Sequence, residues 1–182
     1  MEKHIKLLIL DIDETLVFAT RKPLDREADF KTELYHVYKR PYLDEFLEFC
    51  RIHFEVGIWT TGGDEYAEDV QKSLFSDGYP LSFTWSSERC TRKFDQVMFH
   101  PYYIKDLKKL KKKGYRLEEI IMVDNTPRKL EKNYGNLVAI KDWEGDPEDR
   151  ELLRLINYLT YLKDVENVRA VEKRFWAKQY EV

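Results

Sequence analysis

An apolar stretch near the start of the chain ends in two carboxylates, and this combination most restricts the possible fold. Residues 5–10 are all Ile or Leu apart from Lys6, which is typical of a strand buried on both faces of a parallel sheet. Asp11 and Asp13 follow directly, so both lie at the carboxyl end of that strand. Open α/β sheets bind ligands at this end, where two close carboxylates can share a hard cation while one attacks and the other transfers protons.

A second apolar stretch, residues 56–59, ends in hydroxyl groups. Thr60 follows it, and the turn Gly62-Gly63 precedes a helix that we expect to begin near Asp64. The hydroxyl and the backbone N–H of Thr60 can donate to a phosphate oxygen, and the positive end of the helix would lie nearby. Taken singly, Thr60 fits the end of a strand or a helix cap equally well.

A third buried stretch, residues 120–123, ends in an acid and an amide. Asp124 and Asn125 supply hard oxygen ligands suited to Mg²⁺, and Pro127 cannot continue the strand's hydrogen-bonding ladder. The same residues would also form an ordinary β-turn. Upstream, Lys105 enters a predicted helix, and its ammonium can neutralise a transferring phosphoryl group.

Each of these features has a simpler structural interpretation when it is considered alone. An Asp-x-Asp pair commonly forms a turn or a cap, and most lysines are solvated surface groups. The four features occur in order at successive ends of predicted elements, which turns alone do not explain. The sequence therefore favours one common phosphate site.

Together these residues resemble the four motifs of the haloacid dehalogenase superfamily of aspartate-nucleophile phosphatases. Within it, four segments are similar to the RNA polymerase II C-terminal-domain phosphatases of the Fcp/Scp type, also called NLI-interacting-factor-like phosphatases. These segments are residues 10–17, 39–47, 103–107 and 123–127. The resemblance extends from about residue 5 to about residue 159. It implies a Rossmann-like three-layer sandwich around a central parallel sheet.

The resemblance also implies a Mg²⁺-dependent reaction through an aspartyl phosphate. Asp11 would be the nucleophile, and Asp13 would protonate the leaving oxygen and later deprotonate water. Thr60 and Lys105 would hold the phosphoryl oxygens.

For the metal, the resemblance implies three protein ligands. These are the Asp11 carboxylate, the Asp13 backbone carbonyl and Asn125. Asp124 would orient Lys105 or a metal-bound water.

Two departures from the family pattern concern the substrate. Scp-like proteins usually have Thr-Ala-Ser at the second motif, whereas residues 60–62 are Thr-Thr-Gly, so the hydroxyl two residues on is missing. The segment 89–103 is also longer than in the small eukaryotic members. Neither departure changes the expected chemistry, but together they leave the identity of the substrate undetermined.

Strands and helices are expected to alternate, which predicts an α/β fold with right-handed crossovers. The expected strands are 5–11, 54–60, 82–85, 119–124 and 137–141, and the expected helices are 41–51, 64–75, 102–112 and 148–163. Pro41 would open the first helix in its first turn.

The stretch between Thr15 and Pro41 predicts a small β insertion in place of a large cap, with a strand at 35–39. By the resemblance, members with little cap leave the site open to bulky substrates. This favours phosphoserine or phosphothreonine in a protein or peptide. A small-molecule phosphatase for nucleotides or sugars uses the same residues and remains the alternative; a non-catalytic binding module is disfavoured because Asp11 and Asp13 are both retained.

The 182 residues fit a single domain, 1–182, whose tail from about 164 is expected to be helical and to pack on the domain. Such packing favours a monomer over a dimer. We find no signal peptide and no membrane-spanning apolar run, and we expect a cytoplasmic protein, or a nuclear one in a eukaryote. The net charge of −3 argues against general nucleic-acid binding. Cys50 and Cys90 are expected to be free thiols.

Overall fold

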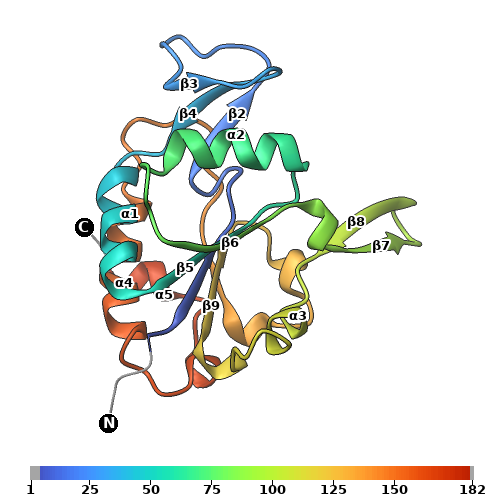
Figure 1. The fold of residues 1–182 in the computed structure, drawn as a ribbon, viewed down its shortest axis with the longest axis vertical. Coiled ribbons are helices and arrows are strands. Elements are labelled where there is room, and N and C mark those ends of the chain that lie inside the picture. The colour runs from blue at the N-terminus through green and yellow to red at the C-terminus, as the bar shows by residue number, and fades with distance from the viewer. Residues whose placement is uncertain (1–4, 181–182) are drawn as a thin grey trace.

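The computed structural model describes residues 5–180, and a five-stranded sheet lies at its centre (Figure 1). The strand order is β10-β9-β1-β5-β6, and each neighbouring pair is parallel. The strands are β1 (Leu7–Leu10), β5 (Glu55–Trp59), β6 (Leu81–Trp85), β9 (Ile120–Asp124) and β10 (Leu137–Ala139). The predicted α/β class is confirmed, and all five strands fall within about two residues of their predicted ranges.

Strand β1 is central and buried on both faces, because its alternate side chains enter two separate apolar cores. Leu8 and Leu10 join the core beneath the longer helices, whereas Leu7 and Ile9 join the core on the opposite face. Burial on both faces explains why the strand is a continuous apolar run.

Three helices of eleven or twelve residues cover the first of these cores. They are α1 (Leu43–His53), α2 (Asp64–Leu74) and α4 (Glu151–Leu162), and each was predicted. Pro41, however, precedes the first turn of α1, because the chain reverses at Tyr42 with a φ of 64° before the helix begins at Leu43. No described helix is both long enough and apolar enough to cross a membrane.

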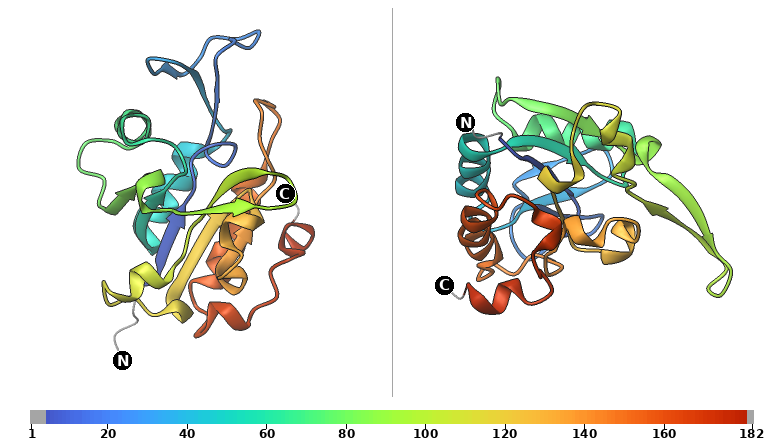
Figure 2. Two further views of the ribbon diagram at one scale, coloured as in Figure 1. Left: turned by 90° about the vertical axis from the view of Figure 1, so that its right-hand side faces the viewer. Right: turned by 90° about the horizontal axis from the view of Figure 1, so that it is seen from below.

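The predicted helix 102–112 is wrong over its first half. Residues in this range instead form β8 (His100–Ile104), which pairs with β7 (Thr91–Asp95) in an antiparallel hairpin. Tyr102, Tyr103 and Ile104 favour strands, and β7 offers them a ladder partner. Only the short helix α3 (Lys108–Lys111) remains, so Lys105 lies just after a strand. The hairpin projects from the body of the molecule (Figures 1 and 2).

The predicted β insertion is confirmed as a three-stranded antiparallel sheet of order β2-β4-β3. Its strands are β2 (Val17–Thr20), β3 (Phe30–Lys31) and β4 (His36–Lys39). It lies beyond the end of the main sheet from which β1 leads into Asp11 (Figure 1). The insertion is therefore small and stands at the edge that bears the predicted site.

The tail packs on the domain as expected. Trp176 is buried, stacks on Tyr158 with ring centroids 5.3 Å apart, and donates from Nε1 to the Ala139 carbonyl at 2.7 Å. Between residues 164 and 180, regular helix is limited to a 3₁₀ turn at Val168–Ala170 and to α5 (Trp176–Gln179). The expectation of a helical tail therefore holds only for these short segments, and residues 181–182 lie outside the described range.

Candidate active site

Five of the predicted site residues converge at one edge of the central sheet. Asp11 follows β1, Thr60 follows β5, and Asp124 is the last residue of β9. Parallel strands present their carboxyl ends at the same edge, so these side chains become neighbours although they are far apart in sequence. Lys105 reaches the same point from the end of β8, and Asp13 lies two residues beyond Asp11.

The centre of the site is an ion-paired cluster around Asp11. Lys105 Nζ lies 2.8 Å from Asp11 Oδ1 and 2.6 Å from Asp124 Oδ2, and all three side chains are at least 99% buried. Lys105 Nζ donates to Asp124, which we expect to orient either Lys105 or a metal-bound water. Such a group excludes water and holds one carboxylate oxygen in a fixed direction.

Lys129 is a second cation in this cluster, and nothing in the sequence pattern indicated it. Its Nζ lies 2.7 Å from Asp11 Oδ2 and 3.3 Å from Asp124 Oδ1. Burial raises the pKa of Asp11, but the ammonium groups of Lys105 and Lys129 outweigh this effect and lower that pKa below its usual value. Asp11 is therefore held as a carboxylate, the form that a nucleophile requires.

Asp13 has a different environment from Asp11. Tyr66 donates a hydrogen bond to Asp13 Oδ1, and Thr60 Oγ1 donates to Asp13 Oδ2 at 3.3 Å. Burial raises the pKa of Asp13, and the negative charge of Asp11 adds to this, although the bond from Tyr66 opposes it. A carboxyl group with a raised pKa is suited to donating a proton.

Thr60 differs in one respect from the expectation. Its backbone N–H donates to the carbonyl oxygen of Trp85, the last residue of β6, at 2.9 Å. This N–H group is therefore not free to bind phosphate. The hydroxyl remains beside Asp13 and accepts from the Gly62 N–H at 2.9 Å. Of the two predicted donors on Thr60, only the hydroxyl faces the site.

Asn125 is held so that its oxygen and nitrogen face different partners. Its Nδ2 donates to Glu14 Oε2 at 3.3 Å and to Asp142 Oδ1 at 3.0 Å. Its Oδ1 faces Lys129 Nζ at 3.5 Å, on the side of the Asp11 cluster. The amide oxygen therefore faces the Asp11 cluster, where it could coordinate a cation.

The chemistry of the donor set fits a divalent cation. Carboxylate and amide oxygens are the hard ligands that Mg²⁺ prefers, and oxygens from Asp11, Asp124 and Asn125 already surround the cationic Nζ of Lys129. Within residues 5–180 no group of three His, Cys, Asp or Glu side chains gathers as a metal-binding cluster. The predicted set does not require one, because it combines a carboxylate and an amide with a backbone carbonyl.

Comparison with known proteins decides the family. Residues 6–169 match the model of the NLI interacting factor-like phosphatases. A relative from Dictyostelium discoideum, described as a probable C-terminal domain small phosphatase, is 33% identical over 174 residues, which cover 92% of this chain and 54% of the relative. The chain belongs to the NLI interacting factor-like phosphatase family. It spans about half the length of the curated relatives it matches.

Solved structures show the same fold. Fission yeast RNA polymerase II CTD phosphatase Fcp1-R271A bound to beryllium fluoride superposes with a TM-score of 0.60 at 19% identity, covering 96% of this chain and 54% of that chain. A HAD-superfamily hydrolase from Geobacter sulfurreducens gives a TM-score of 0.50 at 16% identity, covering 75% of this chain and 89% of that one. The expected HAD-like fold is therefore confirmed.

The departure at residues 60–62 has a structural explanation in this NLI interacting factor-like phosphatase. A Cβ atom at Gly62 would lie 2.7 Å from the Tyr66 ring, so glycine leaves room for that ring. The Tyr66 hydroxyl in turn donates to Asp13. A tyrosine from α2 thus brings a hydroxyl to the region from which the usual side chain of the second motif is missing.

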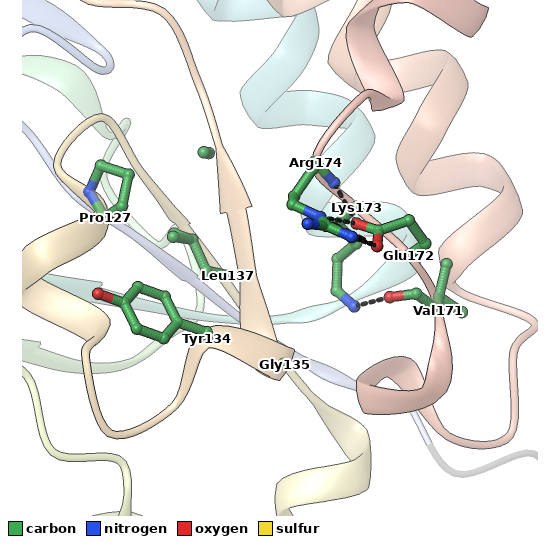
Figure 3. Close-up of a pocket in the computed structure, with 9 residues that line it drawn as sticks. Pro127, Tyr134, Gly135, Leu137, Val171, Glu172, Lys173 and Arg174 are labelled. Atoms are coloured by element: carbon green, nitrogen blue, oxygen red, sulfur yellow. Dashed lines mark hydrogen bonds and ion pairs between the residues drawn. The ribbon is translucent and has the colours of Figure 1, made fainter.

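Two hollows lie beside the segment that follows β9. One of about 450 Å³ is lined by the segment after β9 and by the tail, and includes Tyr134, Leu137 and Lys173 (Figure 3). It contains none of the predicted catalytic residues. A smaller hollow of about 160 Å³ adjoins the cluster, because Lys129 both lines it and contacts Asp11; its other walls are Thr61, Tyr102, Tyr103, Thr126 and Arg128.

Other residues of interest were only partly visible in the sequence. Arg40 lies in a segment that carried the family resemblance, yet nothing in the pattern indicated its bidentate pair with Asp149, at 2.8 and 3.0 Å. Cys50 and Cys90 are free thiols as predicted. Burial raises the pKa of both, which disfavours either as a nucleophile.

Proposed function

We propose that the chain is a Mg²⁺-dependent phosphatase that forms an aspartyl phosphate on Asp11 and acts on phosphoserine or phosphothreonine in a protein or peptide. The observation that carries the proposal is the contact of Lys105 with both Asp11 and Asp124 in a buried cluster. Lys105 is 94 residues from Asp11 and 19 residues from Asp124 in sequence, yet the three side chains meet there. Membership of the phosphatase family supports the same reaction class.

In the first step, a carboxylate oxygen of Asp11 attacks phosphorus in line with the departing oxygen. The P–O bond to the serine or threonine oxygen breaks as the new bond to Asp11 forms, and Asp13 gives its proton to the leaving oxygen. Lys105 and the Thr60 hydroxyl compensate charge on the phosphoryl oxygens in the transition state.

In the second step, Asp13 removes a proton from water, which attacks phosphorus and breaks the bond to Asp11. This releases inorganic phosphate and restores both carboxyl groups. The bonds from Tyr66 and Thr60 fix Asp13, so the same side chain is held for both steps. When bound, Mg²⁺ would be held by the Asp11 carboxylate, the Asp13 carbonyl and Asn125, and would neutralise oxygens that otherwise repel the carboxylate.

The open edge supports a bulky substrate. The insertion has strands of only four, two and four residues, so the part of the chain that the structure describes carries no large cap over the cluster. The matched relative is described as a probable C-terminal domain small phosphatase, which supports a phosphorylated protein as the class of substrate proposed here. A small-molecule phosphatase would use the same catalytic groups and is separated from this proposal only by substrate preference.

The substitution Asp11→Asn tests the nucleophile. It keeps the size of the side chain but removes the attacking charge, so Mg²⁺-dependent turnover of a phosphoserine peptide should fall at least about 10³-fold. Asp77→Asn is the matched control, because it makes the same chemical change at an exposed position. Retention of most activity by Asp11→Asn, with circular dichroism unchanged, would refute the assignment.

Substrate class needs a separate comparison. The values of kcat/KM should be measured with phosphoserine, phosphothreonine and phosphotyrosine peptides and with a panel of sugar and nucleotide phosphates. We expect the phosphoserine and phosphothreonine peptides to be preferred. A strong preference for one metabolite would overturn the proposed substrate and leave the mechanism intact.

A further inference from the structure

Lys129 occupies a defined position inside the acidic cluster. It belongs to the 3₁₀ turn Pro127–Leu130, which follows β9 directly, and its side chain is only 15% exposed. Its Nζ lies 2.7 Å from Asp11 Oδ2, 3.3 Å from Asp124 Oδ1 and 3.5 Å from Asn125 Oδ1. Asp11 and Asn125 are two of the three groups that the proposed function assigns to Mg²⁺.

The two lysines of the cluster divide the carboxylate oxygens between them. Lys105 contacts Asp11 Oδ1 and Asp124 Oδ2, whereas Lys129 contacts the other oxygen of each residue. Two ammonium groups therefore balance two buried carboxylates. A divalent cation on Asp11 Oδ2 would meet the Lys129 ammonium at close range, and like charges repel strongly where water is excluded.

A second position is available to the Lys129 side chain. Its side chain lines the hollow of about 160 Å³ beside Tyr102 and Tyr103, and none of the carboxylates of the cluster lines that hollow. A lysine has a long flexible stem, so rotation about its side-chain bonds can move Nζ by several ångströms without moving the backbone.

We propose that the Lys129 ammonium holds the cation position of the metal-free enzyme, and that Mg²⁺ binds only as this side chain moves out. Lys129 is then a positioning residue that keeps the Asp11 cluster neutral before metal arrives and sets the affinity for magnesium. The inference rests on the proposed function, because it takes the metal to bind Asp11 and Asn125.

The test compares magnesium affinity in Lys129→Met, Lys132→Met and the unaltered chain by isothermal titration calorimetry. Met keeps most of the side-chain volume and removes the charge. Since the apparent affinity is reduced by the fraction of molecules in which the site is open, Lys129→Met should bind Mg²⁺ tighter by on the order of tenfold. Lys132→Met makes the same change nearby, where the lysine pairs with Asp106 and is 42% exposed, and should leave the affinity within about twofold.

Each outcome bears on a different claim. Equal affinities for Lys129→Met and Lys132→Met, or weaker binding by Lys129→Met, would overturn the role of Lys129. If Asp11→Asn is inactive in the same preparations, the proposed function survives that result. Absence of Mg²⁺ binding in all three proteins would overturn the role of Lys129 together with the proposed metal requirement.

A measurement on the unaltered chain keeps the inference testable if Lys129→Met fails to fold. Modification of lysines by an amine-reactive reagent, followed by mass spectrometry, reports the accessibility of each ammonium. Saturating Mg²⁺ should raise the labelling rate of Lys129 at least about threefold, since the group leaves its ion pairs, and should leave that of Lys132 unchanged. A labelling rate of Lys129 that stays constant or falls would contradict the displacement.

Discussion

Asp11 and Asp13 are identical side chains two residues apart, yet their surroundings set opposite protonation tendencies. Two ammonium groups lower the pKa of Asp11 in spite of its burial, whereas burial and the charge of Asp11 raise the pKa of Asp13. One group is thus favoured as a carboxylate and its neighbour as an acid. This division matches the two roles proposed for the first step, attack on phosphorus and protonation of the leaving oxygen.

The role of Asp13 as an acid predicts a dependence on the leaving group. Asp13→Asn removes the proton that an alkoxide leaving group needs, so kcat on a phosphoserine peptide should fall about 10²–10⁴-fold. A p-nitrophenolate leaving group needs little protonation, and kcat on p-nitrophenyl phosphate should fall by a much smaller factor in the first step. Rapid-quench measurement of the first turnover on both substrates checks this prediction.

Tyr66→Phe supplies the control for that prediction. It removes the hydroxyl that bonds to Asp13 and leaves the proton donor in place. The fall in kcat that Tyr66→Phe causes should be similar on the phosphoserine peptide and on p-nitrophenyl phosphate. Equal losses on both substrates for Asp13→Asn would show that Asp13 does not protonate the leaving group.

The residues of the site differed in how visible they were in the sequence. Asp11, Thr60 and Asp124 could be predicted because each ends an apolar strand, and the position is set by local pattern. Lys129 could not, because the direction of a lysine depends on the turn that carries it and on the carboxylates it meets. Those carboxylates reach it across 118 residues of sequence in the case of Asp11.

At the level of elements, the same distinction separates the sheet from the hairpin. Four of the five parallel strands, β1, β5, β9 and β10, are largely buried runs whose composition nearly determines their state, and β6 is partly buried. The hairpin β7–β8 is mostly exposed, and β7 is held by contacts with the turn after β9, including Arg128 with Asp95 at 2.5 Å and Lys93 with Glu131. These contacts join residues far apart in sequence, so the local sequence pattern does not indicate them. For this reason residues 102–104 were predicted as helix.

The hairpin carries an exposed apolar tip close in the fold to the active-site turn. Val97, Met98 and Phe99 are 84%, 66% and 80% exposed, and Asp95, next to this tip, contacts Arg128 in the segment that bears Lys129. Exposed apolar groups of this size commonly mark a contact surface. Since the site edge is otherwise open, the tip is suited to holding the chain of a peptide substrate.

Replacing all three tip residues with serine tests this role. We expect kcat/KM on a protein or long phosphopeptide to fall about fivefold to tenfold, as loss of about 1 kcal/mol of apolar contact would produce. Turnover of p-nitrophenyl phosphate, which is too small to reach the tip, should not change. Replacing exposed Leu34, in the insertion, with serine is a control of similar chemistry. Equal effects on the large and the small substrate would exclude a docking role.

At the scale of the whole molecule, Arg40 joins segments that surround the site without entering it. Its guanidinium pairs with Asp149 before α4, and Nη1 donates to the carbonyl oxygens of Thr15 and Lys141 at 3.1 Å each. Thr15 follows the Asp11–Asp13 motif, Lys141 follows β10, and Asp149 precedes α4. The side chain is fully buried, so removing its partner would leave a charge without compensation.

The pair predicts a pH-dependent part of the stability. Burial raises the pKa of Asp149, but the hydrogen bonds and charge of Arg40 outweigh it and lower that pKa below the usual 3.8. A carboxyl group whose pKa is lower in the folded state stabilises the fold above its unfolded pKa, and this contribution is lost as the pH falls through the folded pKa. Asp149→Asn should therefore lower the free energy of unfolding by about 1.5–3 kcal/mol at pH 7.

Urea unfolding of Asp149→Asn and of the unaltered chain between pH 7 and pH 3 measures this difference directly. The gap between the two should stay constant down to about pH 5, because Asp149 is ionised in both folded and unfolded states there. Below about pH 4 this difference in the free energy of unfolding should narrow, because Asp149 of the unaltered chain becomes protonated and its charge no longer stabilises the fold. Asp77→Asn should show no gap at any pH. A gap for Asp149→Asn that is the same at pH 7 and pH 3 would mean that Arg40 stabilises the molecule through packing and its carbonyl contacts, and not through the charge of Asp149.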